Sequence, residues 1–311
     1  MIDNVSGKSQ LVKLTTNVGG ISLKLPFMQA SGILGGNPEA LEIVAKGEVG
    51  ALVTKSITPH PRKGNDPPII VEVECGYVNA VGLSNPGKAA IPKLVEVGRK
   101  YNLPVIVSVA GSNVNDFTEV AWFAEDSGAS AIELNLSCPH AKGMGLEIGM
   151  DRKLSRLIVE SVSTTTKIPV FVKMGYLDSL VERASEMLEA GADVLVLINT
   201  LRAMKVDVYS MKPVLTNLVG GLSGPAIKPI ALRAVYEVYK ELKAPIIGVG
   251  GISKWEDVVE FMLVGARAVQ VGSILAKKGI GIFSELKAGL IYWMNEMGFK
   301  NLDDFIGAAV D

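Results

Sequence analysis

Short β-branched runs alternate with longer amphipathic stretches along the whole chain, and this alternation constrains the fold more than any other feature. The runs predict strands at Phe27 to Ala30, Ala51 to Thr54, Val105 to Val109, Ala131 to Leu136, Val170 to Lys173, Val194 to Ile198, Ile246 to Val249 and Ala268 to Gly272. The stretches between them predict helices at Pro38 to Lys46, Lys88 to Tyr101, Asp116 to Ser127, Arg152 to Thr165, Ser179 to Ala190, Ile230 to Leu242, Glu256 to Leu263 and Phe283 to Met297. Repeated β-then-α units predict a (β/α)₈ TIM barrel over residues 1–311, whereas a doubly wound open sheet is the alternative that periodicity leaves open.

Three of the predicted helices end in the same way, with a glycine followed by an alanine. Gly128, Gly191 and Gly265 stand at these ends. A glycine there can adopt the left-handed conformation that terminates a helix, and the alanine then starts the next strand. The repetition indicates equivalent structural units.

Composition excludes several classes of protein. With 48% hydrophobic and 20% charged residues, the chain can bury a large core in one domain. The balance of 31 Lys+Arg against 32 Asp+Glu argues against a nucleic-acid partner. The opening residues lack the pattern of a signal peptide, and no apolar run reaches the roughly 18 residues of a spanning helix. We therefore expect a cytoplasmic protein that does not enter the membrane.

Two cysteines and two histidines limit the metal and redox chemistry of the chain. Cys75 and Cys138 are too few for a disulfide framework or for the ligands of an iron–sulfur cluster. His60 and His140 do not form a zinc site by themselves. We expect no metal, and we expect Cys75 to pack beneath the long connection that contains it.

The segment from Asn135 to His140 carries the clearest sign of chemistry. An apolar run delivers Asn135 and Cys138 to the end of a predicted strand, which is where a parallel α/β protein places its active site. Pro139 stops the strand, and the glycines at 143, 145 and 149 predict a mobile loop, rather than a helix, covering the cysteine. An inert buried thiol is the alternative interpretation.

Two connections are long enough to suggest function. Residues Pro59 to Ala89 are rich in proline, glycine and asparagine, and residues Leu201 to Pro229 contain the run Gly220 to Pro225. Both connections are expected on the predicted catalytic face. Loops of this length in a compact domain are commonly functional or disordered. The apolar residues spaced through them argue against disorder.

Glycines after the last two predicted strands indicate a phosphate site. Gly250 and Gly251 follow one strand and Gly272 with Ser273 follows the next, so that backbone N–H groups can face an anion. Each turn alone is more typical of tight packing or helix capping than of phosphate binding; the two together with Gly224 favour phosphate. No G-x-G-x-x-G opens a helix after the first strand, so a Rossmann dinucleotide site is not implied.

Two lysines at strand ends complete the predicted site. Lys55 and Lys173 each leave an apolar wall at the rim, where an ammonium requires an anionic partner. A solvent-exposed lysine at a fraying strand end is the alternative. Asn135, Asn199 and Thr200 add neutral hydrogen-bonding groups, and the set describes a pocket for a flat anionic ring and a phosphate-bearing cofactor.

Taken in order, these motifs resemble the dihydroorotate dehydrogenase family, specifically its class 1B catalytic subunits. The resemblance rests on Ala30 to Gly32, Lys55-Ser56, Asn79 to Leu83 with Asn85 to Gly87, Asn135 to Pro139, Ile198 to Thr200, Gly220 to Pro225, Gly250-Gly251 and Gly272-Ser273. It implies FMN bound by Ser31, Lys55, Ser56, Asn135, Lys173, Ile198, Gly224, Gly250, Gly251, Gly272 and Ser273. It also implies orotate or dihydroorotate bound by Lys55, Asn79, Ala80, Val81, Gly82, Leu83, Asn135, Asn199 and Thr200.

The resemblance implies oxidation of L-dihydroorotate to orotate in de novo pyrimidine (UMP) biosynthesis. A proton leaves C5 and a hydride passes from C6 to FMN, and Cys138 fills the role of the base. Class 1B enzymes pass the electrons to a second subunit that carries FAD and a 2Fe–2S cluster, and so to NAD⁺. We expect a homodimer of this chain, with contacts through the outer helices, inside a heterotetramer. The lack of an N-terminal membrane-binding extension argues against the quinone-reducing class, whereas a soluble acceptor such as fumarate, or an unfamiliar partner protein, stays open.

Two positions depart from the family pattern and leave alternatives open. His140 stands where an asparagine ligand of the pyrimidine is usual, and Ser108 stands where an asparagine near the flavin is usual. The stretches Ala124 to Ala129 and Glu133 to His140 also resemble dihydropyrimidine dehydrogenases, so FMN-dependent reduction of uracil or thymine is the second hypothesis. A catalytically inactive barrel that serves as a binding protein is the third.

Overall fold

The centre of the protein is a parallel sheet of eight strands. The structure is a computed structural model that describes residues 12–137 and 146–310. The sheet runs in the order β3, β16, β15, β10, β9, β8, β7, β4. Its strands are β3 (Phe27–Gln29), β4 (Leu52–Val53), β7 (Val105–Val109), β8 (Ala131–Asn135), β9 (Val170–Met174), β10 (Val194–Leu197), β15 (Ile246–Val249) and β16 (Ala266–Val271). All eight predicted strands are therefore present.

The two end strands of this sheet meet and close it into a barrel. The backbone N–H of Gly50 donates to the carbonyl of Phe27 across the seam at 2.8 Å. The Nε2 of Gln29 donates to the carbonyl of Val53 at 2.7 Å. The predicted (β/α)₈ barrel is confirmed, and the doubly wound alternative is wrong because an open sheet leaves its end strands apart.

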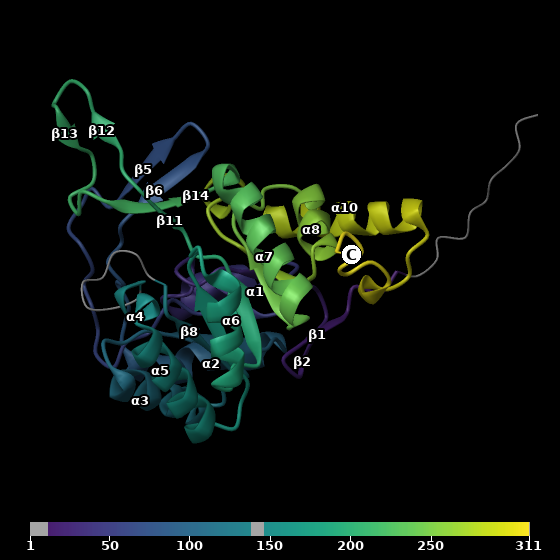
Figure 1. Ribbon diagram of the computed structural model, residues 1–311, viewed down its shortest axis with the longest axis horizontal. Helices are drawn as coiled ribbons and strands as arrows, with labels where there is room; N and C mark the ends of the chain where they lie inside the picture. Colours follow the sequence, from purple (N-terminus) through teal and green to yellow (C-terminus); the bar gives the residue numbers. More distant parts are fainter. Residues whose placement is uncertain (1–11, 138–145, 311) are drawn as a thin grey trace, which may run out of the picture.

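Helices surround the barrel, as Figure 1 shows. They are α1 (Pro38–Ala45), α2 (Ile91–Tyr101), α3 (Val114–Asp126), α5 (Arg152–Thr165), α6 (Leu180–Glu189), α7 (Lys228–Leu242), α8 (Trp255–Leu263) and α10 (Gly281–Met297). Short turns add α4 (Leu146–Met150), α9 (Leu275–Lys278), η1 (Lys88–Ala90), η2 (Pro225–Ile227) and η3 (Leu302–Asp304). Asn37, Asn113 and Asp151 start α1, α3 and α5 because each side chain accepts a backbone N–H from the first turn.

The three repeated helix ends have the predicted conformation. Gly128, Gly191 and Gly265 have φ values of +89°, +104° and +112°. A Cβ at Gly265 would also lie 2.1 Å from the ring of Tyr239. Only glycine combines the left-handed backbone with this close approach, which explains the choice of residue.

Alternation along the strands separates two apolar cores. Ala131, Phe171 and Val194 belong to a cluster inside the barrel, whereas their neighbours Ile132 and Val172 belong to the larger cluster against the helices. This is the two-residue period of a strand. Polar side chains appear on the inward positions only toward the carboxyl ends of the strands.

A hairpin that the sequence did not predict seals the amino-terminal end of the barrel. It consists of β1 (Thr16–Val18) and β2 (Ile21–Leu23), which pair antiparallel. Val18 and Leu23 are buried in the inner cluster, and a Cβ at Gly19 would lie 2.7 Å from Val194. The hairpin therefore acts as an apolar plug.

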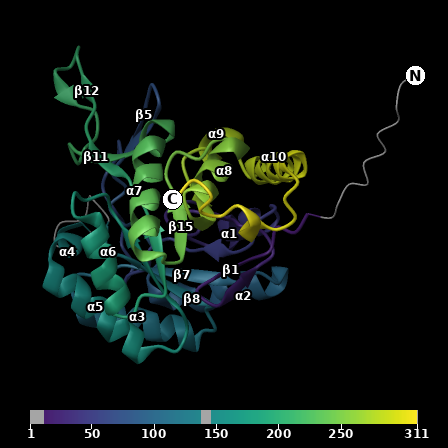
Figure 2. The same ribbon diagram turned by 45° about the vertical axis from the view of Figure 1, so that its right-hand side comes forward.

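The two long connections form a second, smaller sheet rather than loops. Its strands are β11 (Leu201–Ala203), β14 (Gly220–Ser223), β6 (Gly76–Asn79) and β5 (Ile70–Val73), in that order. A hairpin of β12 (Val206–Asp207) and β13 (Lys212–Pro213) projects beyond it in both Figures 1 and 2. The prediction placed these connections correctly at the carboxyl-terminal face, but it was wrong to expect loops, because they form a four-stranded sheet.

Two further expectations are wrong. Cys75 lies in the turn between β5 and β6 and is exposed, so it does not pack beneath the connection. The glycine-containing segment that was predicted as a loop includes α4, and Gly149 lies within that helix. A Cβ at Gly149 would lie 2.0 Å from the carbonyl oxygen of Leu136, so glycine permits close packing on the end of β8.

Candidate active site

A cavity of about 470 Å³ lies at the carboxyl-terminal end of the barrel, between the strand ends and the small sheet. It brings together nearly all of the predicted site residues: Ser31, Lys55, Ser56, Asn79, Val81, Gly82, Leu83, Asn135, Lys173, Ile198, Asn199, Thr200, Gly224, Gly250, Gly251, Gly272 and Ser273. Ala80 is fully buried and does not line the cavity. Cys138 and His140 lie outside the described residues.

Asn135 organises the polar side of the cavity. Its Nδ2 donates to Ser56 Oγ at 2.8 Å, and its Oδ1 accepts from Ser137 Oγ at 3.3 Å and from Asn199 Nδ2 at 3.4 Å. Asn199 Nδ2 also donates to Ser137 Oγ at 2.8 Å. Because each amide has several partners, the network fixes which atoms can donate and accept at the cavity wall.

Ser108 lies behind this network. It is fully buried and does not line the cavity, but its Oγ is 3.0 Å from Ser56 Oγ, and Ser56 does line it. Ser108 therefore touches the cavity through one intermediate hydroxyl.

Lys55 presents a positive charge to the cavity. The side chain is partly buried, and this burial lowers the pKa of the ammonium below its ordinary value. Among the described residues no carboxylate forms an ion pair with it. A Cβ at Gly36 would lie 2.9 Å from Lys55 Cδ, and one at Gly35 would lie 2.7 Å from Lys55 N. The glycine pair thus makes room for the lysine, whose cation is available to an anionic ligand.

Lys173 has the partners that Lys55 lacks. Only 3% of the residue is exposed, so the alternative of a surface lysine is wrong. Its Nζ donates to Gln270 Oε1 at 2.7 Å and to Ser31 Oγ at 3.2 Å, and it lies 3.9 Å from Glu133 Oε1. Burial lowers the pKa of the Lys173 ammonium, and the Glu133 charge opposes that shift.

The predicted phosphate glycines gather at one side of the cavity. Gly224, Gly250 and Gly251 have φ values of +104°, +128° and +78°. A Cβ at Gly251 would lie 3.0 Å from the carbonyl oxygen of Gly224, so these two turns touch. A Cβ at Gly272 would meet only Ala30, at 3.8 Å. Because glycine has no side chain, the space at this position belongs to the cavity.

A buried carboxylate shapes the turn after Gly251. Asp257 accepts from Ser253 N at 2.7 Å, Ser253 Oγ at 3.0 Å and Lys254 N at 3.1 Å, and it pairs with Lys228 Nζ at 2.7 Å. Burial raises the pKa of the Asp257 carboxyl, but the hydrogen bonds from Lys228 and Ser253 outweigh burial and hold it below its ordinary value. No pattern in the sequence indicates this role for Asp257.

The small sheet supplies the remaining wall. Asn79 Nδ2 donates to the carbonyl of Gly221 at 3.3 Å, which joins β6 to β14 at the cavity. Tyr77 and Ile70 also line the cavity, and sequence reasoning missed both, as it missed Gln270. An alternating Val-Gln-Val pattern at the end of β16 was the available signal for Gln270, because it places the glutamine on the inward face.

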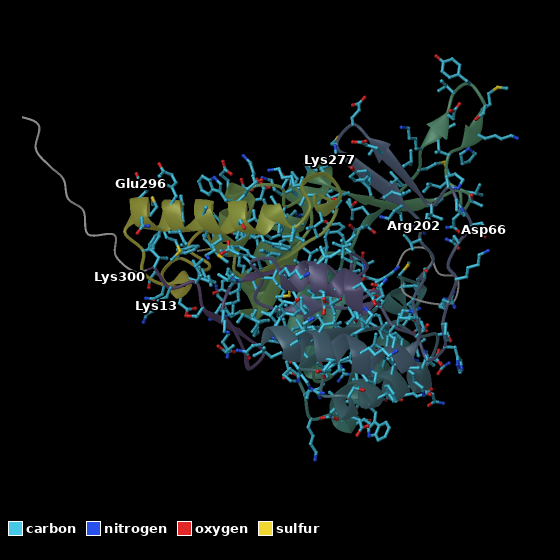
Figure 3. All side chains as sticks on the ribbon, turned by 180° about the vertical axis from the view of Figure 1, so that it is seen from behind. Lys13, Asp66, Arg202, Lys277, Glu296 and Lys300 are labelled. Carbon is cyan, nitrogen blue, oxygen red and sulfur yellow. The ribbon has the colours of Figure 1, made fainter. Side chains whose placement is uncertain are left out.

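Figure 3 places Lys277, Arg202 and Asp66 at the end of the molecule that carries the small sheet, far from Lys13, Lys300 and Glu296. Lys277 Nζ pairs with Glu72 Oε1 at 2.6 Å and lies 5.7 Å from the centre of the Tyr77 ring. The ion pair joins α9 to β5 beside the cavity.

No group of three or more His, Cys, Asp or Glu among the described residues is arranged to hold a metal ion. In the same part of the chain, no helix combines the length and apolar character required to cross a membrane.

Comparison with known proteins identifies the family. The sequence profile of the family described as dihydroorotate dehydrogenase matches residues 13–294. This chain belongs to the dihydroorotate dehydrogenase family. The resemblance inferred from the sequence motifs is therefore confirmed.

Relatives within the family agree over almost their full length. A putative dihydroorotate dehydrogenase A (fumarate) of Aeropyrum pernix is 47% identical over 96% of this chain and 97% of its own length. The catalytic subunits of dihydroorotate dehydrogenase B (NAD⁺) from Thermoplasma volcanium and Pyrococcus furiosus are each 45% identical, covering 96% and 93% of this chain and 98% and 96% of their own lengths. The matches to the two B (NAD⁺) catalytic subunits confirm the predicted resemblance to class 1B dihydroorotate dehydrogenases.

A solved structure supports the fold. The dihydroorotate dehydrogenase of Eimeria tenella, in complex with ferulenol, superposes with a TM-score of 0.83 over 98% of this chain and 90% of that one, at 24% identity. This likeness shows that the two chains share the barrel architecture.

Proposed function

We propose that this dihydroorotate dehydrogenase family member oxidises L-dihydroorotate to orotate in pyrimidine biosynthesis, with FMN bound in the cavity. The observation that carries the proposal is the cavity itself, which is lined by Lys55, Lys173 and polar and glycine residues from widely separated parts of the chain. Its volume of about 470 Å³ falls in the range of small-molecule and cofactor sites. The names of the relatives point to the same reaction.

The residues at the glycine-rich side and floor fit FMN. The touching turns at Gly224 and Gly251 and the open space at Gly272 suit a phosphate approached by backbone N–H groups. The buried charge of Lys173 suits a ring that becomes electron-rich on reduction. The proposed FMN ligands are Ser31, Lys55, Ser56, Asn135, Lys173, Ile198, Gly224, Gly250, Gly251, Gly272 and Ser273.

The opposite side of the cavity fits the substrate. Lys55 has no carboxylate partner among the described residues, and the carboxylate of dihydroorotate would supply one. The amides of Asn79, Asn135 and Asn199 can donate to and accept from the pyrimidine ring. The proposed substrate ligands are Lys55, Asn79, Val81, Gly82, Leu83, Asn135, Asn199 and Thr200, with Ala80 restricted to backbone contacts by its burial.

The reaction needs a base in addition to a cofactor. When bound, FMN supplies the acceptor for the hydride that leaves C6 of the substrate. Cys138 is the proposed base for the proton at C5, because it follows the end of β8 by three residues and the last residue of β8, Asn135, lines the cavity. Loss of one proton and one hydride converts L-dihydroorotate to orotate and balances the reaction.

The proposed electron acceptor is a partner subunit that carries FAD and a 2Fe–2S cluster and reduces NAD⁺. The relatives named as B (NAD⁺) catalytic subunits support this route, whereas the relative named A (fumarate) points to a soluble acceptor. In the proposed assembly two copies of this chain form the core of a heterotetramer.

Anaerobic titration of the purified protein with L-dihydroorotate, followed by flavin absorption, tests the proposal. We expect the flavin to bleach, and orotate to appear in equal amount. A yellow protein that is bleached by dihydrouracil but not by dihydroorotate would contradict the substrate and favour the uracil-reducing alternative. A colourless protein that takes up no added FMN would contradict the cofactor.

A further inference from the structure

Three polar side chains meet inside the barrel at the floor of the cavity. Lys173 on β9 is 3% exposed, and Glu133 on β8 and Gln270 on β16 are both fully buried. Lys173 and Gln270 line the cavity, whereas Glu133 lies behind them, two residues before Asn135 on the same strand. Below this layer the barrel interior is apolar, with Phe171 and Ala131 in the inner cluster.

Gln270 connects the two charged groups. Its Oε1 accepts from Lys173 Nζ at 2.7 Å, and its Nε2 donates to Glu133 Oε2 at 2.5 Å. This orientation of the amide places its acceptor against the ammonium and its donor against the carboxylate, and the opposite orientation would lose both bonds. Gln270 is therefore held in one orientation by charges on both sides.

One carboxylate oxygen of Glu133 is buried without a hydrogen-bond partner among the described residues. Its Oε1 accepts no hydrogen bond from the described residues and lies 3.9 Å from Lys173 Nζ. An ammonium buried among apolar side chains is costly unless an opposite charge is close. The nearby carboxylate meets that need without taking the hydrogen-bonding position beside the ammonium, which Gln270 and Ser31 occupy.

We propose that Glu133, acting through Gln270, positions Lys173 and maintains its positive charge beneath the ligand in the cavity. The inference rests on the proposed function, in which that ligand is FMN. Lys173 has three N–H donors, and the described residues accept two of them. The remaining donor can face the cavity. Glu133 and Gln270 are positioning residues, since neither carboxylate oxygen nor amide nitrogen needs to touch the ligand.

A charged Lys173 would bind reduced FMN more tightly than oxidised FMN, because the reduced ring carries more negative charge. The midpoint potential of the bound cofactor reports this difference. We expect Glu133→Gln to lower the ratio of reduced-FMN affinity to oxidised-FMN affinity about tenfold. For a two-electron couple this change lowers the midpoint potential of the bound FMN by about 30 mV. If the inference holds, Lys173→Met adds nothing in the Glu133→Gln background, because without the Glu133 charge the buried Lys173 side chain is held as the neutral amine. A second drop of similar size on adding Lys173→Met would overturn the inference.

A matched control separates this effect from general damage to the barrel. Gln29 is also a fully buried glutamine, but it donates to Val53 across the β3–β4 seam and is not among the hydrogen-bond partners of Lys173. Gln29→Leu should leave the potential unchanged, whereas Gln270→Leu should shift it in the same direction as Glu133→Gln. A wild-type potential in Gln270→Leu would overturn the proposed connection.

Two outcomes keep the test independent of folding and of the proposed function. If Glu133→Gln does not fold, Glu133→Asp and Gln270→Leu replace it. Glu133→Asp keeps the carboxylate and should preserve the midpoint potential. A shift in Glu133→Asp as large as the shift in Gln270→Leu would contradict the role of the Glu133 charge. A wild-type protein that binds no FMN contradicts the proposed function. A wild-type protein that binds FMN, with all variants at the same potential, contradicts only this inference.

Discussion

The two ends of the barrel differ in chemistry although the same strands build both. At the amino-terminal end, the β1–β2 hairpin inserts Val18 and Leu23 into an apolar cluster. At the carboxyl-terminal end, the same inward positions carry Glu133, Lys173 and other polar groups around a cavity. The comparison separates residues that serve stability from residues that serve chemistry, and substitutions at the two ends should affect different measurements.

The largest effect is expected at the apolar end. Leu23 is 1% exposed, so Leu23→Ala should lower the free energy of unfolding by about 2–5 kcal/mol, through lost burial and an unfilled cavity. Urea unfolding measures this change, and the FMN affinity of the folded protein should stay the same. Leu157 on α5 is 51% exposed, and Leu157→Ala is the matched control, with a change within about 0.5 kcal/mol. A weakened FMN site in folded Leu23→Ala would break the separation between the ends.

The next effect concerns the proposed base. Cys138→Ala should slow anaerobic flavin reduction by dihydroorotate about 100-fold or more while FMN remains bound, because a positioned base contributes about this much. Stopped-flow absorption measures the rate. In the wild type the rate should rise with pH as the thiolate forms, given an ordinary thiol pKa of about 8.5. Cys75→Ala changes the other cysteine, which is exposed in the β5–β6 turn, and should leave the rate unaltered. Normal reduction by Cys138→Ala would remove the cysteine from the mechanism.

Lys55 should matter for the substrate and not for stability. Lys55→Met should weaken orotate binding about 10- to 100-fold, since a charge-assisted hydrogen bond contributes about 1.5–3 kcal/mol. Because burial lowers the pKa of Lys55, its ammonium loses its proton below the ordinary lysine range. Orotate affinity should therefore fall as the pH rises through that lowered pKa. Calorimetric titration at several pH values measures both effects.

The control for this variant is a lysine without access to the cavity. Lys63 is exposed and pairs with Asp66 at 2.7 Å, so Lys63→Met should not change orotate affinity. Equal affinity of Lys55→Met and the wild type for orotate would contradict the assignment of the substrate carboxylate.

The sequence predicted the barrel well because its strands and helices are local patterns. Every predicted strand and helix is present, and the apolar run from Ala131 to Leu136 marks β8. The small sheet escaped prediction because its pairs join distant segments: β6 pairs with β14, placing Asn79 opposite Gly221. Nothing in the local sequence near Asn79 reports that partner. The β1–β2 hairpin escaped prediction for a different reason, because each of its strands has only three residues.

The candidate site divides in a similar way. Lys55, Asn135 and the glycines at 250 and 251 could be predicted because each follows a recognisable strand. Alternation along the strands could place Gln270 and Glu133 on the inward face, but it could not assign their role, because that role depends on their contact with each other across the barrel. Asp257 is similar: it appears in the sequence as an ordinary acidic residue in the first turn of a helix, whereas the structure shows that it binds the turn at Ser253.

The smallest effect tests how sharply the two ends are divided on a single strand. Ser108, near the cavity end of β7, bonds to Ser56 Oγ at 3.0 Å. Ser108→Ala should remove about 0.5–1.5 kcal/mol of hydrogen bonding. Ser56 keeps its bond from Asn135, so FMN affinity should change less than tenfold, but measurably, because Ser56 lines the cavity.

Ser130, which precedes β8, provides the matched hydrogen bond at the other end of β7. Its Oγ accepts from the backbone N–H of Val105, at the start of β7, at 3.2 Å. Ser130→Ala removes a comparable bond and should lower the free energy of unfolding with no change in FMN affinity. Fluorescence titration of the apoprotein with FMN, combined with urea unfolding, compares the two variants. If both changed FMN affinity equally, the strand would transmit local changes along its length, and the division between a stabilising end and a ligand-binding end would not hold for β7.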